Sequence, residues 1–83
     1  MKFYTYILFS EKLNKHYIGQ TNNLENRLKR HNNHQEKYTR KGTPWKLLCA
    51  VEVESRAEAM KLEKKLKNFK SAKRLKNWME NNK

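Results

Sequence analysis

Three stretches of the chain have the character of β-strands. Residues 3–9 are aromatic and β-branched without polar alternation, which is typical of a central strand covered on both faces. The polar segment 10–15 contains Asn14 and indicates a hairpin loop, leading to a short second strand over 16–20. Residues 45–54 alternate apolar positions with a mixed opposite face and predict a third strand.

Side-chain alternation divides these strands into faces. In the first strand, one predicted face carries Tyr4, Tyr6 and Leu8, and the other carries Phe3, Thr5, Ile7 and Phe9. In the third strand, one predicted face carries Trp45, Leu47, Cys49, Val51 and Val53. Gly19 is expected to end the second strand, where the chain must change direction.

Three further segments have helical spacing. Asn22 is the expected cap of the first, with Glu25 three positions later; Ser55 and Glu58 form the equivalent pair before the second, and Ser71 precedes the third. The apolar stripes are Leu24, Leu28 and His31 in the first helix, Ala59, Leu62, Leu66 and Phe69 in the second, and Ala72, Leu75, Trp78 and Met79 in the third. The order ββαβαα, with helices packed on a small sheet, predicts an α+β fold.

Composition narrows the class of partner. The 83 residues have room for one domain, and 20 Lys and Arg against 8 Asp and Glu give a formal charge of +12. A domain this basic is suited to a polyanion or an anionic membrane surface, and of these we favour nucleic acid. The aromatic content, two Trp, four Tyr and three Phe, argues for a folded domain, because disordered chains are poor in aromatics.

The chain carries no strong indication of export. Cys49 is the only cysteine, so no intramolecular disulfide can form, which suits a reducing compartment. No apolar run approaches the length of a membrane span, and the N-terminal residues lack the pattern of a secretory signal. We therefore expect a cytoplasmic protein that does not contact membranes.

Glu63 is the most informative single residue. On a helical wheel it falls between Ala59 and Met60, within the apolar arc of the second helix. A carboxylate there requires a cation or hydrogen-bond donors. Two interpretations follow from the pattern alone: an ion pair with Lys or Arg, or a metal ligand.

Other candidate residues have ordinary explanations when considered singly. Tyr6 and Tyr17 would be core or rim aromatics, and Arg27 a solvated charge on the first helix. His31, on the apolar face of that helix, would more often be a hydrogen-bonded core histidine than a catalytic one. Their combination is more informative than any one of them.

That combination resembles the GIY-YIG nuclease domain, and the resemblance covers essentially the whole chain. The residues that carry it are Tyr4-Thr5-Tyr6-Ile7-Leu8, then after ten intervening residues Tyr17-Ile18-Gly19-Gln20-Thr21, then Asn23-Leu24, Arg27-Leu28 and His31, with Glu63 in the later helix. Lys37-Tyr38-Thr39-Arg40 running into Pro44-Trp45-Lys46-Leu47 is similar to the small, stand-alone branch of this superfamily. Tyr4 and Thr5 stand where the family name has glycine and isoleucine.

The resemblance implies a three-stranded antiparallel sheet flanked by helices and cleavage of phosphodiesters with one divalent ion, Mg²⁺ or Mn²⁺. It implies that Glu63 holds the metal and that Arg27 stabilises charge on the attacked phosphate. Either Tyr17 or Tyr6 would position or deprotonate the water, and His31 joins them as a catalytic candidate. Many relatives also carry an asparagine after the acidic helix; Asn77 is at about the right distance, but its surroundings do not match, and we assign it no role.

Basic residues supply the expected nucleic-acid surface. Between Lys61 and Lys76 there are eight Lys or Arg against Glu63 alone, and clusters of one sign contact phosphates without reading bases. The candidate binding residues are Arg30, Tyr38, Arg40, Lys41, Lys67, Lys70, Lys73 and Arg74.

Three functions fit these observations. The first is a metal-dependent endonuclease acting on DNA in preference to RNA, including branched or damaged forms, taken here as a monomer. The second is a basic nucleic-acid-binding module with the nuclease fold and little or no cleavage. The third is a component that binds a protein or ribosomal RNA partner through its basic helices.

Overall fold

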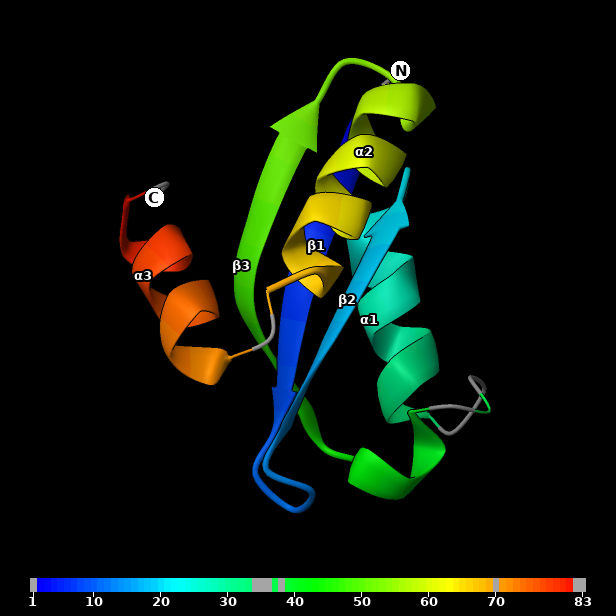
Figure 1. Cartoon of the computed structure of the whole chain (residues 1–83). Helices are drawn as coiled ribbons and strands as arrows, with labels where there is room; N and C mark the ends of the chain where they lie inside the picture. Colours follow the sequence, from blue (N-terminus) through cyan, green and yellow to red (C-terminus); the bar gives the residue numbers. More distant parts are fainter. Residues whose placement is uncertain (1, 34–36, 38, 70, 82–83) are drawn as a thin grey trace.

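The computed structural model describes residues 2–33, 37, 39–69 and 71–81, and its elements follow the predicted order ββαβαα. They are β1 (Phe3–Ser10), β2 (Lys15–Thr21), α1 (Leu24–Asn32), the short 3₁₀ turn η1 (Arg40–Gly42), β3 (Trp45–Val53), α2 (Arg56–Lys67) and α3 (Ala72–Asn81). The strands form one antiparallel sheet in the order β2-β1-β3, with β1 at the centre (Figure 1). The predicted α+β class and the antiparallel sheet are confirmed.

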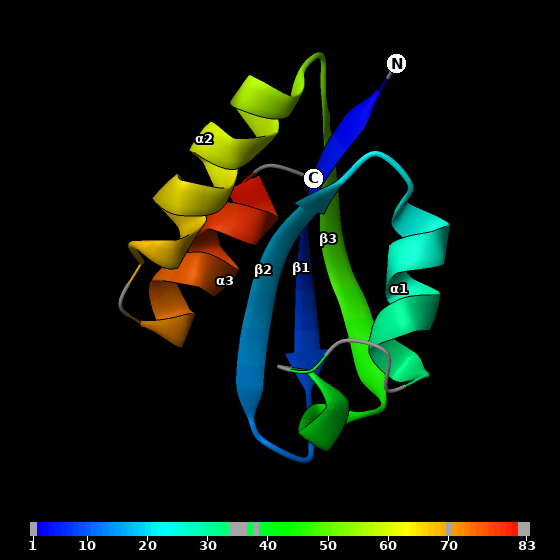
Figure 2. The same cartoon turned by 90° about the vertical axis from the view of Figure 1, so that its right-hand side faces the viewer.

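The sheet is the middle of three layers, with α2 and α3 on one face and α1 on the other (Figure 2). Ile7 and Ile18 pack with Leu66 and Leu75 of the two-helix layer. On the opposite face the core cluster is Tyr6, Leu8 and Trp45, with Leu24 and Leu28 of α1 packed against it. The two faces predicted for the first strand therefore face different helical layers. Among the described helices, none is long and apolar enough to cross a membrane.

An irregularity in β3 corrects the predicted alternation of that strand. Ile7 lies opposite Cys49, but the next residue, Leu8, lies opposite Leu47, so Leu48 is an extra residue in the register. Directly opposed residues share a face, and a bulge of this kind therefore moves Leu47 to the face opposite Cys49. Leu47 and Leu48 remain 39% and 46% exposed.

Gly19 has a different role from the predicted one. β2 continues past it to Thr21, and its backbone is not in the left-handed region. Gly19 lies opposite Tyr6, and a Cβ at this position would be 2.5 Å from the Tyr6 Oη atom and 2.7 Å from Cζ. Glycine is thus required because the Tyr6 ring passes directly over the backbone of β2.

The helix caps agree with the sequence in two cases of three. Ser55 caps α2 and Ser71 caps α3, each through its hydroxyl. For α1 the cap is Asn23 rather than Asn22: the Asn23 side chain accepts a hydrogen bond of 3.0 Å from the Asn26 backbone N–H. Both asparagines are good capping residues, so propensity alone does not separate them.

Gly19→Ala is expected to lower the free energy of unfolding by about 1–3 kcal/mol, the usual cost of overpacking a filled site. The added methyl would meet the Tyr6 ring, which is 1% exposed and has no room to withdraw. Urea unfolding followed by circular dichroism measures the change, with the adjacent Gln20→Ala as a control that should cost less. A Gly19→Ala protein as stable as the wild type would contradict the proposed close contact.

Candidate active site at the edge of strand β2

Strand β2 lies at an open edge of the sheet with a helix on either side. Seen from this edge, α2 and α3 flank it on one side and α1 on the other (Figure 2). Side chains from α1, β2 and α2 can therefore reach a common surface, although the two helices pack on opposite faces. Most of the predicted catalytic residues belong to these three elements.

A buried chain of hydrogen bonds links β1 to α1 and to the segment before η1. The Tyr6 hydroxyl lies 2.9 Å from His31 Nε2, and His31 Nδ1 lies 2.7 Å from the Thr39 hydroxyl. Trp45 Nε1 donates to the Thr39 carbonyl at 2.6 Å. Tyr6, His31 and Thr39 are each 1% exposed. His31 is therefore the hydrogen-bonded core histidine that its position on the apolar face suggested.

Each nitrogen of the His31 imidazole has a hydroxyl partner in this chain of contacts. A neutral histidine has one donor and one acceptor nitrogen, and both neighbours are hydroxyls that can act in either sense. The proton can thus occupy either ring nitrogen while both partners stay bonded. Such an arrangement fixes the position of the Tyr6 and His31 rings and leaves the direction of the hydrogen bonds reversible.

Tyr17 is the tyrosine at the outer end of this cluster. Its ring centroid lies 5.0 Å from that of His31, 6.4 Å from that of Tyr6 and 6.2 Å from that of Trp45. Tyr17 is half-buried, whereas Tyr6 is enclosed and its hydroxyl is bonded to His31. Of the two tyrosines that the sequence left as alternatives, Tyr17 is the more exposed to solvent.

Arg27 and Arg30 lie on α1, and both are half-buried. Arg27 is one helical turn before His31, so the two side chains share a face of α1. This placement brings a guanidinium to the side of the helix that bears the aromatic cluster.

Glu63 forms the ion pair that one of its two interpretations predicted. Lys67 Nζ lies 3.4 Å from Glu63 Oε1, with side-chain exposures of 56% and 21%. No group of three His, Cys, Asp or Glu side chains that could hold a metal occurs within the described ranges. The ligand that the sequence offers at this place is one carboxylate, that of Glu63. A single carboxylate fits a hard cation such as Mg²⁺, which keeps several waters and takes its other oxygens from a substrate phosphate.

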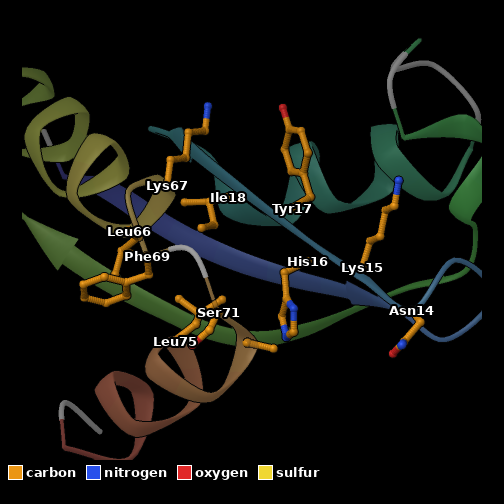
Figure 3. Close-up of a pocket in the computed structure, with 11 residues that line it drawn as sticks. Asn14, Lys15, His16, Tyr17, Ile18, Leu66, Lys67, Phe69, Ser71 and Leu75 are labelled. Carbon is orange, nitrogen blue, oxygen red and sulfur yellow. The ribbon is translucent and has the colours of Figure 1, made fainter.

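A hollow of about 410 Å³ runs along β2 and joins Lys67 to Tyr17 (Figure 3). Its lining comprises Asn14, Lys15, His16, Tyr17, Ile18, Leu66, Lys67, Phe69, Ser71, Ala72 and Leu75. The polar ends of Lys15, Tyr17 and Lys67 point to the same side in this view, and His16 points to the other (Figure 3). Lys67 thus forms an ion pair with Glu63 and lines the same hollow as Tyr17.

The predicted nucleic-acid residues do not form one patch. Arg40 and Lys41 belong to η1, next to the segment bonded to α1, whereas Lys73 and Arg74 belong to α3 in the opposite layer. Tyr38 and Lys70 fall outside the described residues.

Sequence reasoning missed residues that complete the site. Thr39 and Trp45 support His31, and Lys15 and His16 line the hollow. Thr39 follows a segment without periodicity, so nothing in the sequence pairs it with His31. Lys15 could have been found from the alternation of β2, which places it on the face of Tyr17 and places His16 on the opposite face.

Comparison with known proteins agrees with this description. Residues 2–77 match the GIY-YIG catalytic domain, so the chain belongs to the GIY-YIG family of nuclease domains. The solution NMR structure of the UPF0213 protein BH0048 from Bacillus halodurans is similar, with 30% sequence identity and a TM-score of 0.60 over 96% of this chain and 84% of that one. No curated protein matches the chain.

Tyr6→Phe is expected to lower the free energy of unfolding by about 1–3 kcal/mol, because it leaves a buried His31 nitrogen without its partner. Tyr17→Phe removes the same hydroxyl from a half-buried ring and should cost less. Parallel urea titrations of the two variants measure the difference. Equal losses of unfolding free energy would show that the Tyr6–His31 hydrogen bond stabilises the fold no more than the Tyr17 hydroxyl does.

Proposed function

We propose that this protein is an endonuclease that hydrolyses phosphodiester bonds in DNA with one divalent ion, Mg²⁺ or Mn²⁺. The observation that carries the proposal is the arrangement of the two tyrosines. Tyr17 borders the basic hollow beside β2, while Tyr6 and His31 form a buried hydrogen-bonded support behind it. Membership of a nuclease family adds weight to this choice of chemistry.

In this proposal Tyr17 orients the attacking water and accepts its proton. A free phenol has a pKa of about 10, and only about one in a thousand is ionised at pH 7, so positive charge near it favours the reaction. Lys15 and Lys67 line the same hollow, and their ammonium groups point to the side of the phenol oxygen (Figure 3). His31 serves as a positioning residue, because it contacts the tyrosine rings from the buried side.

Arg27 is the proposed contact for the attacked phosphate. Phosphoryl transfer depends on in-line positioning and on neutralising the charge of the non-bridging oxygens. A guanidinium presents a planar fork of donors that can bind two of these oxygens together. The position of Arg27, on the same face of α1 as His31, supports this role.

Glu63 is the proposed metal ligand. When bound, the ion would neutralise charge on the phosphate and polarise it toward attack. Lys67 competes with a metal ion for the Glu63 carboxylate, and it also lines the hollow beside β2, where a phosphate is an alternative partner. Exchange of Lys67 from carboxylate to phosphate would couple DNA binding to exposure of the metal ligand.

A second candidate function is binding without cleavage. It is favoured by the same ion pair, because Lys67 already neutralises Glu63. It is favoured also by Asn77, which is exposed on α3 and does not line the hollow. The basic surface would then hold nucleic acid with a strong dependence on salt.

Purified protein is expected to cleave DNA when supplied with Mg²⁺ or Mn²⁺ and to be inactive in EDTA. Arg27→Ala, Glu63→Gln and Tyr17→Phe should each lower the rate about a hundredfold or more, because each removes a group that acts on the phosphate, the metal or the water. Supercoiled plasmid, single-stranded DNA, branched DNA and structured RNA are the substrates to compare by gel electrophoresis.

Arg56→Ala and Glu58→Gln are matched controls for that experiment. They make the same changes of charge in the first turn of α2, and Arg56 lies over the Phe3 ring, 5.5 Å from its centroid. Both should retain the wild-type rate. Salt-sensitive binding by every protein, without metal-dependent cleavage by any, would establish the second candidate function instead.

Metal binding provides a separate expectation for Glu63 and Lys67. In isothermal titration with Mn²⁺, Glu63→Gln should abolish binding. Lys67→Met should tighten binding about two- to fivefold, because it removes a cation that competes for Glu63 with the interaction energy of an exposed ion pair. Lys61→Met is the control for a general change of charge. Unchanged Mn²⁺ binding by Glu63→Gln would exclude this carboxylate as the ligand.

A further inference from the structure

A second hollow, of about 620 Å³, lies between α3 and the end of the sheet. Its lining residues are Phe9, His16, Leu48, Ala72, Lys73, Lys76, Met79 and Glu80. The Phe9 and His16 rings contact each other at 4.9 Å between centroids with an interplanar angle of 48°. Leu48, the extra residue of the β3 bulge, is 46% exposed here. An open apolar surface of this size, with charged residues at its rim, is typical of a binding site.

The second hollow continues the first. His16 and Ala72 line both, so the hollow that borders Tyr17 and Lys67 adjoins the one that borders Leu48 and Met79. The His16 ring points to the side opposite to Tyr17 (Figure 3), and His16 lines the second hollow as well as the first.

Charge along this path is strongly positive. The lining of the two hollows includes four lysines, Lys15, Lys67, Lys73 and Lys76, and one acid, Glu80. Partial burial lowers the pKa of His16, which favours the uncharged ring, and this ring adds to the apolar surface of the two hollows. Cations and flat or apolar side chains thus line the same hollows, which is the combination by which proteins hold single nucleic-acid strands: phosphates on the basic groups and bases on the apolar ones.

We infer that the two hollows form one track for a single nucleic-acid strand, with an unpaired base seated against Phe9, His16, Leu48 and Met79. A base within a duplex has its faces covered by its neighbours, so it would have to leave the stack to occupy this place. The inference rests on the proposed nuclease function and specifies its substrate class: DNA with an unpaired strand next to the cleaved bond.

Leu48→Asn and Leu47→Asn form a matched pair for the test. Both leucines are exposed residues of β3, but Leu47 borders a hollow beside α1, in the layer opposite α3. Neither change alters charge. Fluorescence anisotropy in EDTA measures the affinity of each protein for three labelled probes: an oligothymidylate, an abasic strand of equal length, and a duplex.

Leu48→Asn should weaken oligothymidylate binding about tenfold, within the range for loss of one base contact, and should leave binding of the abasic strand within twofold. Leu47→Asn should leave all three affinities within twofold, and circular dichroism establishes that both variants are folded. Lys73→Gln with Lys76→Gln should weaken binding of the abasic strand and oligothymidylate alike, because phosphates are common to both.

The inference is overturned if Leu48→Asn affects the abasic strand as much as oligothymidylate, or if both leucine variants behave alike. It is overturned also if Leu48→Asn leaves every nucleic-acid affinity unchanged, because the second hollow would then bind no base. Because these measurements need no cleavage, they separate the two proposals. Base-dependent binding without nuclease activity would refute only the proposed function, and cleavage without any effect at Leu48 would refute only the track.

Discussion

The hydrogen bond between Tyr6 and His31 is the contact on which the rest of the candidate site depends. It joins the central strand to α1 in a part of the core from which water is excluded. Breaking it would leave a buried polar atom unpaired, which costs more than the bond itself contributes. The bond also explains two other features. Gly19 has no side chain because the Tyr6 ring lies against it, and Thr39 is buried because His31 requires a partner for its second nitrogen.

The edge position of β2 determines what this buried contact can support. The side chains of an outer strand are accessible from the edge of the sheet. Here the helices on the two faces of β2 both contribute side chains near this edge. α1 contributes Arg27 and His31, while α2 contributes Lys67 and, through it, Glu63. The excess of positive charge on the chain opposes compactness through self-repulsion, and the same charge favours a polyanion as the partner. Binding a phosphate backbone would therefore relieve a cost inherent in the folded chain.

Much of the fold follows from periodicity, and the differences have physical causes. Alternation in residues 3–9 separated the two faces correctly, and the serine caps of α2 and α3 were predicted because few other residues compete for that role. At α1, two adjacent asparagines are equally suited to capping; a turn in which the Thr21 hydroxyl accepts from the Asn23 backbone N–H accompanies the use of the second. The bulge at Leu48 was not predictable, because a one-residue insertion preserves the hydrophobic composition while changing the register.

The candidate site could be predicted only as a set of residues, not as an arrangement. The motif resemblance named Tyr6, Tyr17, Arg27, His31 and Glu63, but which tyrosine is accessible depends on how β1 and β2 pack against α1. The predicted basic residues illustrate the same limit: neighbours in the sequence, such as Lys67 and Lys73, line different hollows. Leu48, the irregular position of β3, lines the second hollow of the inferred track. This coincidence accords with the general observation that local rules fail where a fold has been adapted to a ligand.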